Sequence, residues 1–166
     1  MKSANRLTIL LLSIYLAVLC WILLFKLGVQ FSYMDQRSTN LVPFSGRPDR
    51  MEMILNVVIF IPLGLYAGAL FTRWKWIKKL CFIFGISLLV ETIQYIFRIG
   101  AFDSTDVITN TTGGIIGLLF FAAIEKLFNN NGRTQKFVNI IAATGTVLMF
   151  TLLVMLKLNL LPIRYQ

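Results

Sequence analysis

Long apolar runs separated by shorter polar connections dominate the sequence. They occupy residues 7–25, 51–71, 80–97, 107–124 and 137–158. A helix needs about 20 mainly apolar residues to cross the hydrocarbon core of a bilayer, and each run has about that length. The pattern predicts an all-α membrane protein, a compact bundle of about five transmembrane helices. The runs leave no room for a second unit, so we expect one transmembrane domain over residues 1–166.

The composition supports a membrane protein and argues against a soluble domain and against a nucleic-acid-binding protein. Charged residues make up 14% of the chain and the mean hydropathy is +0.77, whereas a soluble domain has about 25% charged residues. The net charge of +9 comes from basic residues in connections beside apolar runs, so it does not indicate nucleic-acid binding. The chain has no His, and Cys20 and Cys81 lie inside apolar runs without metal-ligand spacing. We therefore predict no metal site and no cofactor.

The distribution of basic residues predicts the orientation. The connection between the second and third runs carries Arg73, Lys75, Lys78 and Lys79 and no acid. By the positive-inside rule this connection is cytoplasmic, which places the N-terminus in the cytoplasm. With an odd number of spans, the C-terminus is then extracellular.

Ionisable and amide side chains are concentrated around the third and fourth runs. A charge at the bilayer centre costs roughly 2.5 to 3.5 kcal/mol on insertion scales, so such groups usually face the protein interior and pair. At about 1.5 Å per residue, Glu91 lies about 10 Å below the outer end of its helix, and Asn56 and Asn110 reach a similar depth. We therefore expect a polar cluster near the external surface. Its members are Asn56, Glu91, Gln94, Arg98, Asp103, Asp106 and Asn110.

The turn from Gly100 to Asp106 leads into the fourth run. Ser104 or Thr105 is the predicted N-cap, and Asp106 is suited to the positive end of the helix dipole. Capping accounts for an acid at this turn but not for Glu91 deeper in the membrane.

Small residues mark the predicted helix contacts. Gly64 and Gly68 share a helix face with Asn56, and this spacing lets a neighbouring helix approach closely. Ala142 and Gly145 in the last run are interpreted as ordinary packing residues. The predicted helix-packing glycines are Gly64, Gly68, Gly113, Gly114 and Gly117.

The connection at residues 26–50 contains Gly and Pro residues that suit an irregular extracellular segment. Its mixture of polar and apolar side chains has two interpretations, a lid folded over the outer membrane surface or a solvated loop. The lid residues would be Arg37, Asn40, Pro43 and Phe44.

Several weak motifs follow one another in an order and spacing that together are fairly specific. They are Trp21 to Leu27, then Arg37, Asn40, Pro43, Phe44, Asn56, Phe60, Pro62, Gly64, Glu91, Gln94, Ile99, Gly100, Asp103, Asp106, Asn110, Gly113, Gly114 and Gly117. On these residues the chain resembles the VanZ-like family over nearly its whole length. The resemblance implies a multi-pass protein of the bacterial plasma membrane that lowers susceptibility to teicoplanin, an envelope-targeting lipoglycopeptide, in Gram-positive bacteria. Many members carry a further acid where this chain has Thr105, which argues against a metal site of three clustered Asp residues.

The first functional hypothesis is a non-enzymatic protein with an outward-facing polar pocket. Its partners would be membrane lipids, a lipid-linked cell-wall precursor or teicoplanin. Arg98 would contact a phosphate or carboxylate, which guanidinium matches bidentately. Glu91, Asp103 and Asp106 would orient Arg98 or hold a cation, and we assign no catalytic residue.

Three alternatives remain open for the same residues. A membrane enzyme acting on a polyprenyl phosphate or lipid head group would use Mg²⁺ held by Asp103, Asp106 and Glu91. The lack of a His base, a Cys or Ser nucleophile motif and a phosphate-binding Gly loop argues against it. A carrier would require a homo-oligomer, since five helices are few for a transporter. The structural alternative is a polar network that fixes helix register.

Overall fold

The computed structural model describes residues 2–25, 37–45 and 50–157, which contain five helices and two short strands. In chain order these are α1 Lys2–Phe25, β1 Thr39–Asn40, α2 Arg50–Leu70, α3 Trp76–Phe97, β2 Phe102–Asp103, α4 Ser104–Phe128 and α5 Asn131–Lys157. The predicted all-helical fold is confirmed, with the addition of the two-residue strands.

Three of the described helices, α2, α3 and α4, are long and apolar enough to cross a membrane. Among the described residues of α1 the apolar stretch is shorter, Arg6–Trp21. The expected total of five membrane-crossing helices therefore stays a prediction.

The helices extend beyond the apolar runs that predicted them. The third run begins at residue 80 but α3 begins at Trp76, and the fourth run covers residues 107–124 but α4 is Ser104–Phe128. Backbone hydrogen bonding continues through polar residues at helix ends, so an apolar run marks only the middle of a helix.

The predicted N-cap of α4 at Ser104 or Thr105 is wrong, because Asp103 occupies that position. Its backbone is extended, with φ −117° and ψ 119°, and its side chain accepts a hydrogen bond from the backbone N–H of Thr105. An N-cap side chain bonds an amide two or three residues later, and Asp103 has this spacing to Thr105. Asp106 lies in the first turn of α4, as expected.

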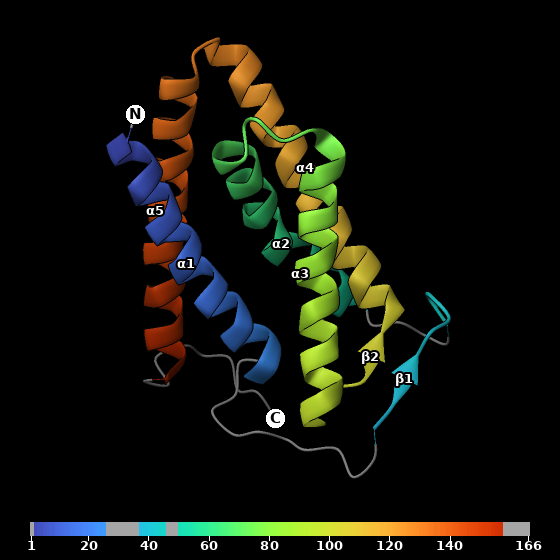
Figure 1. The fold of residues 1–166 in the computed structure, drawn as a ribbon. Coiled ribbons are helices and arrows are strands. Elements are labelled where there is room, and N and C mark those ends of the chain that lie inside the picture. The colour runs from blue at the N-terminus through green and yellow to red at the C-terminus, as the bar shows by residue number, and fades with distance from the viewer. Residues whose placement is uncertain (1, 26–36, 46–49, 158–166) are drawn as a thin grey trace.

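The central position of α2 organises the bundle. It contacts each of the other four helices, and its contact with α4 is the most extensive helix–helix contact in the described chain. Figure 1 shows the α2–α3 and α4–α5 connections at one end of the bundle and β1, β2 and the last turn of α3 at the other. The buried side chains of Phe60, Leu63, Ile83 and Leu118 form the core between α2, α3 and α4.

The connection at residues 26–50 is described only at residues 37–45, since residues 26–36 and 46–49 lie outside the described part of the chain. Its β1 pairs with β2 in parallel, with Thr39 opposite Phe102 and Asn40 opposite Asp103. The pairing places this segment beside the α3–α4 turn, more than 60 residues later in the chain.

Candidate functional site

Asp103 lies at the centre of a hydrogen-bond network that joins α3, α4 and the segment carrying β1. Its Oδ1 accepts from the backbone N–H of Thr105 at 2.7 Å, and its Oδ2 accepts from Asn40 Nδ2 at 3.1 Å. The backbone N–H of Asp103 donates to Glu91 Oε2 at 3.1 Å. A single residue therefore connects three segments that are distant in sequence.

Residues 40–45 make further hydrogen bonds to the start of α4 and to one another. The backbone N–H of Phe44 donates to Thr105 Oγ1 at 3.0 Å, and Ser45 Oγ donates to Asn40 Oδ1 at 2.8 Å. Phe44 has a φ of 57°, and its side chain and that of Pro43 are exposed. The backbone of this segment therefore covers the α3–α4 turn while its apolar side chains point away from the protein.

Arg37 attaches the beginning of this segment to the last turn of α3. Its guanidinium donates to the backbone carbonyl of Ile96 at 3.5 Å and lies 5.7 Å from the centre of the Tyr95 ring. A guanidinium at that distance is attracted to an aromatic face. The predicted lid residues Arg37 and Asn40 thus both contact the α3–α4 region directly.

Glu91 is the most deeply buried acid of the cluster, with 2% of its surface exposed. It shares the buried face of α3 with Ser87 and Gln94. The Ser87 hydroxyl lies 3.5 Å from the backbone carbonyl of Val107, so this face of α3 contacts α4. A carboxyl group at this position depends on protein donors because water does not reach it.

Asp106 connects α4 to α2. Its Oδ1 accepts from Asn56 Nδ2 at 2.8 Å, and Asn56 is buried, with 7% exposed. Asp106 also lies in the first turn of α4, where a carboxylate interacts favourably with the helix dipole.

Asn110 lies one turn further along α4 and is buried, with 1% exposed. Neither its Oδ1 nor its Nδ2 has a hydrogen-bond partner in the described chain. Leaving a buried amide unpaired costs about 1 to 3 kcal/mol, and such groups in native proteins commonly mark strain, function or a bound water or ion.

Arg98 is separated from these interactions. It is the C-cap of α3, with a left-handed backbone at φ 57° and ψ 32° and an exposed side chain. Its side chain takes part in none of the hydrogen bonds described above. Among the predicted cluster residues, the structure therefore links Asn56 to Asp106 and Glu91 to Asp103 by hydrogen bonds. Gln94 and Asn110 are buried on the same two helices, α3 and α4, and Arg98 is exposed at the end of α3.

The predicted packing glycines lie where α2 and α4 touch most closely. A Cβ on Gly64 would collide with the backbone of Gly114, and a Cβ on Gly113 would collide with the carbonyl of Val57. A Cβ on Gly117 would meet the carbonyl of Ile61. The other two glycines meet side chains, Gly68 that of Phe121 and Gly114 that of Ile83.

The acidic residues of the cluster accept hydrogen bonds from protein donors. In the described residues no three His, Cys, Asp or Glu side chains converge as metal ligands. Both oxygens of Asp103 already accept N–H groups, and Glu91 Oε2 accepts a third. The Mg²⁺ site of the enzyme alternative, which would need only one or two carboxylates, therefore stays a prediction.

Two features of the site escaped the sequence analysis. The role of Thr105 as the acceptor for Phe44 N–H was missed, and so was the pairing of β1 with β2. A two-residue strand is too short to produce an alternating apolar pattern, so no local signal predicts it.

Together the apolar helices and the buried polar cluster at one end of the bundle are features of a helical membrane protein. Comparison with known proteins is more specific. A sequence model of the VanZ/LLP1 family matches residues 12–129. The chain is also 43% identical to Protein VanZ of Enterococcus faecium over 148 residues, which cover 87% of this chain and 89% of that protein. No solved structure matches.

The chain belongs to the VanZ-like family, as the order and spacing of its motifs predicted. The match begins in α1 and extends through α4, so it includes the polar cluster and the close contact between α2 and α4.

Proposed function

We propose that the chain is a multi-pass protein of the bacterial plasma membrane that lowers susceptibility to the glycopeptide antibiotic teicoplanin. The polar cluster at the α3–α4 turn interacts with envelope lipid, a lipid-linked cell-wall precursor or the antibiotic. The observation that carries the proposal is the placement of this hydrogen-bonded cluster at one end of the bundle in a member of the VanZ-like family.

The basic connection at the opposite end supports an outward-facing cluster. Arg73, Lys75 and Lys78 are exposed there, next to Trp74 and Trp76. Basic residues favour the cytoplasmic side, and Trp is enriched at the membrane interface. Figure 1 shows β1 and β2 at the other end. This arrangement supports a cluster that faces the outer leaflet and an N-terminus in the cytoplasm. With five spans, the C-terminus is extracellular.

The two kinds of group in the cluster have different roles. Asp103, Asp106 and Glu91 are engaged with protein donors. They hold the shape of the site, and their negative charge orients Arg98. Arg98 is exposed, and it provides the guanidinium for a phosphate or carboxylate of the ligand. This division describes a non-enzymatic binding site.

Expression of the chain in a susceptible Gram-positive host tests the proposal. The intact chain should lower susceptibility to teicoplanin more than to vancomycin. Arg98→Gln should abolish much of this effect, whereas Arg133→Gln, which removes an exposed guanidinium in the first turn of α5, should retain it. Membrane abundance is measured for each variant. An abundant intact chain without any effect on teicoplanin susceptibility would refute the proposal.

A further inference from the structure

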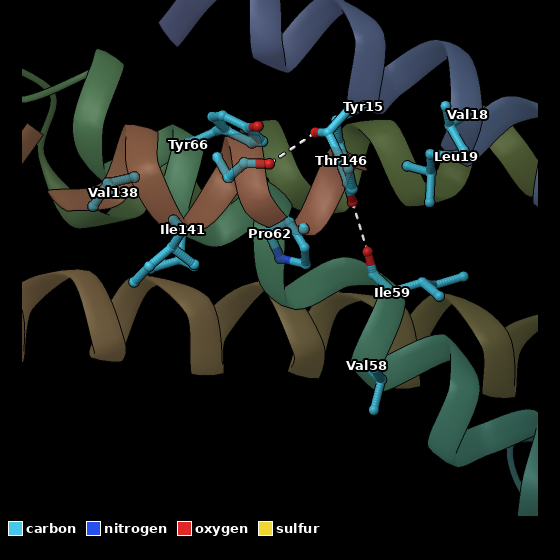
Figure 2. A pocket seen from close by; sticks show the side chains of 13 residues that line it. Tyr15, Val18, Leu19, Val58, Ile59, Pro62, Tyr66, Val138, Ile141 and Thr146 are labelled. Atoms are coloured by element: carbon cyan, nitrogen blue, oxygen red, sulfur yellow. Dashed lines mark hydrogen bonds between the residues drawn. The ribbon is translucent and has the colours of Figure 1, made fainter. Parts of the chain in front are cut away.

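A cavity of about 280 Å³ lies between α1, α2 and α5, separate from the polar cluster. Figure 2 shows Tyr15 and Leu19 of α1, Pro62 of α2 and Ile141 of α5 around it. On α2, the cavity is lined by Val58 and Pro62, whereas Asn56 bonds to α4 on another face of the same helix.

Two of the three side-chain hydroxyls in the cavity wall donate to backbone carbonyls of the protein. The Tyr15 hydroxyl donates to the backbone carbonyl of Ile59 at 2.7 Å, and the Thr146 hydroxyl donates to that of Ala142 at 2.8 Å (Figure 2). The rest of the wall is largely apolar. Apolar cavities of this kind exclude water but accept apolar molecules, because the wall atoms gain dispersion contacts.

The cavity reaches the outside of the bundle at the depth of the hydrocarbon core. Two lining residues, Val58 and Ile141, are also exposed, with 52% and 42% of their surfaces accessible. Val58 lies eight residues after Arg50, the first residue of α2, which corresponds to about 12 Å along the helix. A bilayer core is about 30 Å thick, so hydrocarbon surrounds this opening when α2 spans the membrane.

We infer that this cavity binds one acyl chain of a surrounding bilayer lipid. If a methylene group takes about the 30 Å³ of a water molecule, the volume holds roughly nine such groups, which suits part of a single chain. The inference uses the membrane placement of α2 but neither the polar cluster nor the effect on teicoplanin, so it is tested independently of them.

Photolabelling of the full chain in phosphatidylglycerol nanodiscs tests the inference. A small fraction of the lipid carries a diazirine in one acyl chain, and mass spectrometry maps the labelled residues. A chain inside the cavity should label Leu19 and Tyr66, which are 1% and 2% exposed. Lipids that only surround the protein should label exposed residues such as Leu119 and Phe120 on α4.

Gly145 allows a side chain to be added at the cavity wall by a single substitution. It lines the cavity, and a Cβ built on it meets no atom within 4 Å. Gly85 on α3 has the same open surroundings but does not line the cavity, so Gly85→Leu is the matched control for Gly145→Leu. Labelling of Leu19 and Tyr66 should be lost in Gly145→Leu and retained in Gly85→Leu.

Labelling of Leu119 and Phe120 without Leu19 and Tyr66 in the unaltered chain would overturn the inference, whatever the variants do. Equal labelling of Leu19 and Tyr66 in Gly145→Leu and Gly85→Leu would also overturn it. Either result leaves the proposed effect on teicoplanin untouched, because that effect is measured in cells through other residues.

Discussion

Different faces of α2 pack in different ways. Toward α4, Gly64 lies so close to Gly114 that a Cβ would not fit, and Asn56 makes a 2.8 Å hydrogen bond to Asp106. Toward α1 and α5, Val58 and Pro62 instead line a cavity of about 280 Å³. One face is therefore fixed by backbone contact, while the other leaves space between larger side chains.

The difference in packing bears on the rigidity of the polar cluster. Because α2 and α4 meet through glycines, the polar residues above them are held at defined distances. The face toward α1 and α5 leaves a cavity that can accommodate a flexible apolar chain. The two proposals accordingly assign different kinds of ligand to the polar cluster and to the cavity.

The largest expected effect comes from a side chain added to the close-packed face. Gly113→Leu places its Cβ against the carbonyl of Val57, which cannot move without shifting α2. We expect the free energy of unfolding to fall by about 3 kcal/mol or more. Unfolding by sodium dodecyl sulfate in mixed micelles measures it, with Gly85→Leu as the control. Equal stability of the two variants would contradict the close contact.

A smaller effect is expected where the cluster joins α3 to the turn. Glu91→Leu removes the acceptor of the Asp103 N–H at a buried position and should lower the free energy of unfolding by about 1 to 3 kcal/mol. Glu91→Gln keeps an oxygen acceptor and should retain more of this stability. The same unfolding assay compares the variants, and a Gln variant as unstable as the Leu variant would argue against this hydrogen bond.

The attachment of residues 37–45 to α4 is expected to contribute less to the free energy of unfolding than the hydrogen bond of Glu91. Thr105→Val removes the acceptor of the Phe44 N–H and should cost about 0.5 to 1.5 kcal/mol locally. Hydrogen exchange at the Phe44 amide should become faster. In Thr111→Val, which alters a hydroxyl bonded within α4 to Val107, the rate at Phe44 should not change. Similar hydrogen-exchange rates of the Phe44 amide in the two variants would contradict this attachment.

The smallest effect is expected on the cavity side. Gly145→Leu fills open space and replaces a helical Gly, so its free energy of unfolding should stay within about 1 kcal/mol of the unaltered chain. The unfolding assay compares it directly with Gly113→Leu. If both substitutions destabilise the protein equally, the contrast between the two faces is wrong.

The long apolar runs predicted the helices, and the spacing of small and polar residues predicted several of the contacts that shape the close-packed face. Asn56, Gly64 and Gly68 recur at multiples of four residues, and all three are buried in α2. This prediction is possible because the spacing of residues on a helix face is set by local geometry.

Other features depend on distant segments and could not be predicted. The N-cap at Asp103 was assigned one or two residues too late because neighbouring Ser and Thr residues are equally suitable caps. The cavity depends on how α1, α2 and α5 lie together, so Gly145 was interpreted only as a packing residue. Likewise, nothing local to Thr39 and Asn40 predicts their pairing with Phe102 and Asp103.

Teicoplanin susceptibility of cells expressing Asp106→Asn tests most directly whether the cluster serves function. An Asn at this position can still accept the hydrogen bond from Asn56 but carries no charge. The control is Glu125→Gln, which removes an acid near the opposite end of α4. We expect Asp106→Asn to lose the protective effect at unchanged membrane abundance while Glu125→Gln retains it. Full protection by an equally abundant Asp106→Asn variant would contradict the account.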